Sequence, residues 1–242
     1  MAGRIRAAIS TGLGYNYQLE ANDLRGAALI RESGPLKVRV GYSTLHVKNP
    51  VAIPGQLLSG LNQIAASPFP AIADEARSQL DTMNSLEGAR INYASAGFSY
   101  DDGTWVAQAE ISDLSSTTGI FPKGRQGYAS VGYHTGNFTP YVMISGSRSP
   151  TAASAKTSWA VLGPSAILLQ QGAVSALNAQ RSEQSTLSLG MRWDFDSRAA
   201  LKLQWDHVRV RDHGWGLWSS PITSDGSAGT ANLLSATVDF VF

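Results

Sequence analysis

The sequence predicts an all-β protein, a transmembrane antiparallel up-and-down β-barrel of which about ten strands are visible. Three observations predict this fold. The last segment alternates in polarity and ends on an aromatic residue, the same alternation recurs along the chain, and short and long connections alternate between the segments. Alternation with a period of two is the pattern of a β-strand, and sorted connections are typical of a barrel in a membrane.

The last segment runs from Ala231 to Phe242 and has two different faces. One face carries Phe242, Phe240, Val238, Ala236 and Leu234, and the other carries Val241, Asp239, Thr237 and Ser235. A strand between lipid and a water-filled lumen has this pattern. The alternative for this segment is a half-buried strand of a soluble sandwich or of a lipocalin-like barrel.

The other predicted strands show the same period. The clearest are 186–195, 9–20, 36–43 and 201–206, and weaker ones cover 24–31, 90–100, 105–111, 127–134 and 138–148. With the last segment they make ten strands. The alternation changes phase near His207, which predicts a β-bulge there. The mean hydropathy is −0.10, and the longest apolar stretch, 159–177, is interrupted by glycine, proline and glutamine, so no transmembrane helix is predicted.

The connections separate a membrane barrel from a soluble one. Those at 33–35, 101–103, 135–137 and 196–197 are tight, 115–125 is intermediate, and 48–88, 149–182 and 211–230 are long. Tight turns and long loops therefore fall at opposite ends of the strands, as in outer-membrane barrels. We expect residues 1–242 to form one such barrel domain.

Composition excludes several classes of function. The formal net charge of +1 argues against a nucleic-acid partner, which needs a basic face. The chain has no cysteine, and its four histidines show no metal-ligand spacing. We therefore predict no cofactor and no metal site.

At its end the chain resembles the porins of the Gram-negative outer membrane, whose closing strand finishes on a phenylalanine. The resemblance implies an outer-membrane location, contact with outer-membrane lipid, and reading of Phe242, with Phe240 before it, by the barrel assembly machinery. It also implies girdles of aromatic residues at the membrane interfaces. Trimers are usual among these porins, which raises a homo-oligomer as an expectation. The aromatic residues close to strand ends are Tyr42, Tyr100, Trp105, Tyr133, Trp193, Phe195, Phe240 and Phe242.

Two departures from the porin pattern concern the length of the chain. Such porins usually have 16 or more strands and a cleavable signal peptide, and residues 1–6 contain no apolar run. The chain is either a mature form or part of a longer porin, and we expect the second because residues 3–6 are typical of the end of an earlier strand. Ten strands also suffice for a narrow, largely filled barrel.

The polar faces predict a passive channel for small hydrophilic solutes. Alternation places charged residues of both signs in the lumen, with a slight excess of bases, and Arg39 and Arg192 are central in the two clearest strands. The predicted lumen residues are Arg25, Arg31, Lys37, Arg39, Arg192 and Lys202 against Glu20, Glu110, Asp194, Asp206 and Asp239.

The long connections contain helical patterns. Residues 57–66 and 72–83 have helical spacing and are separated by Pro68 and Pro70, and 165–180 is a third candidate. These helices either form a constriction in the barrel mouth or pack on its rim or on a neighbouring protomer.

An enzyme is the main alternative function. Some ten-stranded outer-membrane barrels are omptin-like proteases with Asp and His at the outer lip, and this chain has Asp206-His207 and Asp212-His213. The second carboxylate pair of such proteases has no clear counterpart here, so we predict no catalytic residues and no enzymatic activity. An adhesive or structural barrel is a further alternative.

Overall fold

The structure is a computed structural model that describes residues 2–10, 16–50, 53–119, 123–150, 152–178, 181–211 and 228–241. Its main element is one ten-stranded sheet in which each strand pairs with the next one along the chain, always antiparallel. The strands are β1 (Ala2–Ser10), β2 (Asn16–Ser33), β3 (Leu36–Val47), β4 (Arg90–Asp101), β5 (Trp105–Ser116), β6 (Gly124–Tyr133), β7 (Phe138–Arg148), β8 (Glu183–Asp196), β9 (Ala199–Val210) and β10 (Gly229–Phe240).

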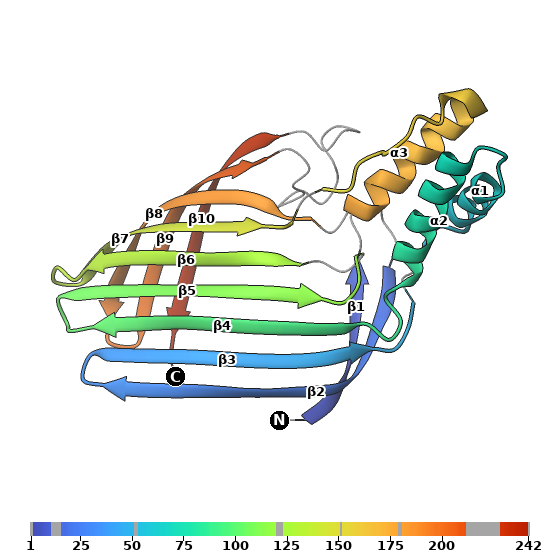
Figure 1. The fold of residues 1–242 in the computed structure, drawn as a ribbon. Helices are drawn as coiled ribbons and strands as arrows, with labels where there is room; N and C mark the ends of the chain where they lie inside the picture. The colour runs from blue at the N-terminus through green and yellow to red at the C-terminus, as the bar shows by residue number, and fades with distance from the viewer. Residues whose placement is uncertain are drawn as a thin grey trace.

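The tight turns lie at one end of this sheet and the long connections at the other, as predicted. The turns β2–β3, β4–β5, β6–β7 and β8–β9 share the end away from the helices (Figure 1). Three of these turns contain a glycine in the left-handed region, Gly34 at φ 56°, Gly103 at φ 83° and Gly136 at φ 57°. Glycine reaches this region without the steric cost that a Cβ adds.

The two faces of the sheet differ in chemistry from β2 to β10. Residues directly opposite each other in an antiparallel pair lie on the same face, so the register assigns each side chain. We call the face that carries Val40, Ile111, Ile144, Leu189 and Val238 the apolar face, and each of these side chains is at least 45% exposed. We call the opposite face the polar face. An exposed apolar band of this extent requires lipid, and the fold is that of a transmembrane antiparallel up-and-down β-barrel.

The N-terminal strands differ from the prediction. The segment 9–20 is not one strand, because Ile9 and Ser10 of β1 pair antiparallel with Tyr17 and Asn16 of β2. The predicted segment 24–31 then belongs to β2, which continues through a register shift between Asn22 and Arg25. Asp23 has φ 50° at this shift.

The predicted bulge near His207 is wrong. The register of β9 runs without a shift from Ala199 to Val210 against β10, and a shift on its other side falls between Trp193 and Asp196. Val208 and Val210 are apolar residues on the polar face, and both are buried at the end of the sheet that carries the long connections. The change in alternation therefore reflects local burial and not an inserted residue.

Three α-helices and one short 3₁₀-helix of the described residues lie beyond the ends of the strands that carry the long connections (Figure 1). Helices α1 (Gly55–Ala65) and α2 (Pro70–Asn84) belong to the β3–β4 connection, and η1 (Ala160–Leu162) and α3 (Pro164–Asn178) to the β7–β8 connection. The helical predictions at 57–66 and 72–83 are confirmed, and so is the one at 165–180 as far as residue 178, beyond which 179–180 lie outside the described residues. Pro70 begins α2 at the position that tolerates a missing N–H.

The main buried apolar cluster of the described residues lies in and beside these helices. Leu61, Ala76, Met83, Leu86 and Trp159 are each at most 1% exposed. The cluster continues onto Leu19, Val47 and Ile91, which lie on the polar face where the strands meet the helices. The helical unit, defined here as α1, α2, η1 and α3, thus rests on the polar side of the sheet end.

Strands β1 and β10 are the first and last of the sheet. Within the described ranges, neither of them pairs on its second side. Unpaired backbone groups in hydrocarbon are costly, so these edges must find partners in a membrane.

Candidate functional site

The polar face presents hydrogen-bonding side chains in continuous rows across the strands. One row runs through Lys37, Ser99, Gln108, Ser130, Met143, Ser188 and Asp206. The next row toward the helices runs through Arg39, Gly97, Glu110, Tyr128, Ser145 and Thr186. These rows make a wide surface with hydroxyl, amide and charged groups, which binds water in preference to lipid.

On β3 to β5 this face carries Lys37, Arg39 and Glu110. Lys37 pairs with Glu32 at 2.6 Å. Arg39 and Glu110 lie in one row with Gly97 between them, about 10 Å apart at the backbone. Within the described part of the chain no ion pair involves Arg39, so its charge faces the open side of the sheet.

On β8 to β10 the polar face carries a connected charge network. Arg192 contacts Asp194 at 2.7 Å and Asp239 at 3.6 Å, and the second contact passes over β9. Lys202 lies 5.1 Å from the ring centre of Tyr141. Asp206 accepts a hydrogen bond of 2.8 Å from the amide of Gln204. Seven of the eleven predicted lumen residues therefore share this face: Lys37, Arg39, Glu110, Arg192, Lys202, Asp206 and Asp239.

Asp194 joins them through its contact with Arg192, although it lies at the register shift of β8.

Between the charged residues of β3 to β5 and those of β8 to β10, the polar face is hollowed. A depression of about 340 Å³ is lined by Tyr93, Glu110, Gln126, Tyr128 and Gln184, together with serines 112, 145 and 147. Its rim offers phenol, amide and carboxylate groups to a polar solute.

Three predicted lumen residues are on the apolar face instead. Arg25 is opposite Thr44 and Arg31 is opposite Val38, both on the side of Val40. Ala21 pairs with Val47 on the polar face, so its neighbour Glu20 lies on the apolar face. There Glu20 contacts Arg6 at 3.2 Å. The shift at Asp23 changes the phase of β2, and the sequence around 27–30 is apolar on both faces, so alternation alone misassigned these residues.

The predicted assembly residues can be placed in part. Phe240 is opposite Ala199 at the end of β10, on the apolar face, and is exposed. Phe242 lies outside the described residues, as do Asp212 and His213. The long connection 211–230 is described only at residues 211 and 228–230.

The helical unit is held together by Glu75, a residue that sequence reasoning missed. Its buried carboxylate accepts hydrogen bonds from the backbone N–H groups of Lys156 and Thr157, both at 2.9 Å, from the Thr157 hydroxyl, and from the indole of Trp159 at 3.2 Å. The amide of Gln170 on α3 donates at 3.3 Å. The sequence signal was a lone carboxylate beside Ala73 and Ala76 on the apolar side of α2.

The pKa of Glu75 reflects two opposing effects. Burial alone raises the pKa of this carboxyl group, but the hydrogen bonds from Thr157, Lys156 and Gln170 lower it more, and the net pKa is below the ordinary 4.5. Glu75 is thus a carboxylate at neutral pH, and it joins the β3–β4 connection to the β7–β8 connection.

The predicted Asp206-His207 pair does not form a catalytic dyad. Consecutive residues of a strand point to opposite faces, and His207 lies on the apolar face, where its Nδ1 is 3.0 Å from Asn232 Oδ1. In the described part of the chain, no three His, Asp or Glu side chains gather as a metal site. No described helix has the length and apolar character needed to cross a membrane.

Comparisons with known proteins give likenesses to solved structures. No protein-family model and no curated protein matches the chain. Among solved structures, it is similar to the outer-membrane expressed OmpT of Vibrio cholerae, with a TM-score of 0.43 and 10% sequence identity. The alignment covers 98% of this chain and 62% of that chain, so the chain spans less than two thirds of the length of OmpT.

One expectation is corrected at this point, namely that the chain is not an enzyme. The sequence excluded enzymatic activity because no complete catalytic constellation is visible in it. Asp212 and His213, one of the two candidate Asp-His pairs, lie outside the described residues, and the absence of a visible constellation is no evidence against an enzyme. The exclusion of enzymatic activity therefore does not stand.

Proposed function

We propose that the chain forms the wall of a porin-like passive diffusion channel for small hydrophilic solutes in the Gram-negative outer membrane. The observation that carries the proposal is the polar face, which presents charged, amide and hydroxyl groups in rows from β3 to β9 while the opposite face is apolar. A wall of this kind separates lipid from water and selects solutes by width and by local field.

Contacts between second-neighbour strands support a lumen on the polar side. Tyr141 on β7 donates a hydrogen bond of 2.6 Å to Gln204 on β9, across Gly190, and Arg192 on β8 reaches Asp239 on β10. Side chains meet across an intervening strand when they point to the inside of a curled sheet. Figure 1 shows β3 to β5 at the front of this curl and β8 to β10 at its back.

The helical unit supplies a restriction at one end of the proposed channel. Its base rests on the polar side of the strand ends, through Leu19, Val47 and Ile91. A water-filled channel also needs a closed wall, and β1 and β10 are the two edges at which this sheet must be completed. We propose that outer-membrane lipid covers the apolar face and that the barrel assembly machinery inserts the chain.

Two arginines on β2 and β3 allow a matched test. Arg39 on β3 lies on the polar face, and Arg31 on β2 lies on the apolar face. The two arginines belong to adjacent residue pairs between these strands. In planar bilayers with a salt gradient, we expect stepwise conductance, and Arg39→Gln should shift the reversal potential toward cation selectivity because a lumen charge acts directly on passing ions. Arg31→Gln should leave it unchanged. Silent bilayers, or equal shifts in the two variants, contradict the proposal.

A further inference from the structure

The apolar face is interrupted by charge at the end of the sheet near the long connections. One row across four strands reads Asp113, Arg125, Arg148 and Glu183. The two arginines are directly opposite each other, and their side chains are 80% and 79% exposed. Like charges directly opposite in a sheet repel each other, so this arrangement needs additional negative charge.

The carboxylates of this row do not supply enough of it. Asp113 contacts Arg125 at 3.3 Å. Glu183 lies 3.9 Å from each of three guanidinium groups, those of Arg148, Arg181 and Arg211, and at that distance none of the three pairs forms a hydrogen bond. In the described part of the chain, the Arg148 guanidinium therefore has no carboxylate within hydrogen-bond distance. We call Arg125, Arg148, Arg181 and Arg211 the arginine cluster.

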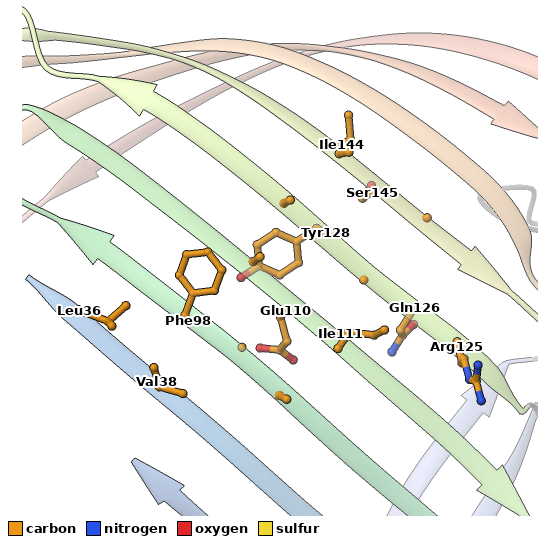
Figure 2. Close-up of a pocket in the computed structure, with 16 residues that line it drawn as sticks. Leu36, Val38, Phe98, Glu110, Ile111, Arg125, Gln126, Tyr128, Ile144 and Ser145 are labelled. Atoms are coloured by element: carbon orange, nitrogen blue, oxygen red, sulfur yellow. The ribbon is translucent and has the colours of Figure 1, made fainter. Parts of the chain in front are cut away.

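An apolar hollow begins directly below the arginine pair. The next row of the apolar face is Ile111, Gly127 and Gly146, so two adjacent positions beneath Arg125 and Arg148 have no side chain. The hollow has a volume of about 930 Å³ and is bordered by Phe98, Ile111 and Ile144, with Leu36 and Val38 at its far side (Figure 2). Ala96, Ala109 and Ala129 lie in its floor, and Arg125 is on its edge.

We infer that the arginine cluster and this hollow form a binding site for one anionic lipid, with the phosphate between Arg125 and Arg148 and an acyl chain over Gly127 and Gly146. The two halves of the site match the two halves of such a molecule in chemistry and order. Guanidinium groups bind phosphate oxygens through paired hydrogen bonds, and a hollow whose lining is mostly apolar accepts hydrocarbon. The site opens on the face that contacts the membrane, at the level of one interface.

Gly146 allows the acyl half to be tested separately from the phosphate half. A Cβ at Gly146 meets the backbone oxygen of Gln184 at 3.4 Å, an ordinary contact, whereas a Cβ at Gly127 meets the Glu110 oxygen at 2.7 Å. Gly146→Val is therefore compatible with the strand, fills the hollow below the arginines and leaves all four charges in place.

The experiment measures lipid binding to the purified full chain in detergent by native mass spectrometry. The probes are phosphatidylglycerol and phosphatidylcholine with identical acyl chains, and inorganic phosphate as a competitor. We expect phosphatidylglycerol to bind at least about tenfold more tightly than phosphatidylcholine. The double variant Arg125→Gln, Arg148→Gln should lose this preference, and Gly146→Val should weaken phosphatidylglycerol binding severalfold. Arg198→Gln removes one charge at the other end of the sheet and should change nothing.

Several results would overturn the inference. Equal binding of the two lipids by the unmodified chain excludes a phosphate site, and a preference that survives in the double variant places that site elsewhere. Displacement of phosphatidylglycerol by an equal concentration of inorganic phosphate, with no effect of Gly146→Val, reduces the site to one for free anions. The comparison of lipids and phosphate on the unmodified chain decides the question even where a variant does not fold.

Discussion

The indole N–H of Trp159 donates a hydrogen bond of 3.2 Å to the carboxylate of Glu75, a residue 84 positions earlier in the chain. This bond joins the two long connections of the described structure, and both residues are buried. The helical unit therefore depends on a charge inside an otherwise apolar cluster. Its removal should loosen the helices and leave the strands intact.

Glu75→Gln should destabilise the helical unit by about 2–4 kcal/mol. Glutamine replaces one of the two carboxylate oxygens with an NH₂ group, which cannot accept the hydrogen bonds that this oxygen receives. Hydrogen exchange of the backbone amides in α2 and α3 measures this local stability, with the β4–β7 strands as an internal reference. Asp74→Asn is the matched control on the same helix, since Asp74 is exposed and its ion pair among the described residues is with Arg77, at 2.7 Å. Equal effects of the two variants would contradict the role of Glu75.

The helical unit should also be sensitive to acid. The pKa of Glu75 is lowered in the folded chain, so the unfolded state binds the proton more readily. The stabilisation is complete above the ordinary pKa of about 4.5 and is lost as the pH falls below that value through the folded pKa. Trp159 emission between pH 7 and pH 3 should report this loosening. A Glu75→Gln variant with the same pH profile would show that another group is responsible.

The two faces of β8 should respond differently to a new charge. Leu187 is exposed on the apolar face and pairs with Ile144, whereas Thr186 is on the polar face and pairs with Ser145. Leu187→Arg should cost about 2–4 kcal/mol of unfolding free energy if it lies near the middle of the membrane, and Thr186→Arg clearly less. Denaturant titration in lipid vesicles measures both, and a larger cost at Thr186 would reverse the assignment of the faces.

The β2–β3 turn should require a residue that adopts positive φ. Gly34 has φ 56°, and a Cβ there meets no neighbouring atom, so backbone strain alone decides the outcome. Gly34→Ala should reduce stability by about 1 kcal/mol, and Gly34→Asn should reduce it less, because asparagine adopts this conformation more readily. The denaturant midpoints of the two variants measure the difference.

Local pattern was enough to predict most of the sheet. Alternation at 186–195 and 201–206 gave strands whose faces the register confirms, since each pair of opposite residues has the chemistry of its face. It failed at Arg25 and Arg31, where the phase of β2 is set by pairing with β3 and not by its own apolar residues. A period of two assigns a face only where the two faces differ in polarity.

The interactions of the helical unit were beyond sequence reasoning. The helices themselves follow from apolar spacing and from the prolines between them, which are local signals. Apart from Gln79 on the same helix, the partners of Glu75 are 81 to 95 residues away, in another connection. The same holds for the arginine cluster, whose members come from β6, β7 and the connections before β8 and after β9 and meet only through the register.

The position of Trp159 has a consequence for the order in which the chain assembles. The Trp159 side chain is buried among residues of α1, α2 and α3, and these helices belong to connections that are separated in the chain by β4 to β7. The four intervening strands must be side by side before the two connections meet, so burial of Trp159 is a late step. The other tryptophans of the described ranges, Trp105, Trp193 and Trp205, are exposed on the apolar face. During insertion, lipid should therefore quench or shift their emission first, and a separate, slower change from Trp159 should time the completion of the wall.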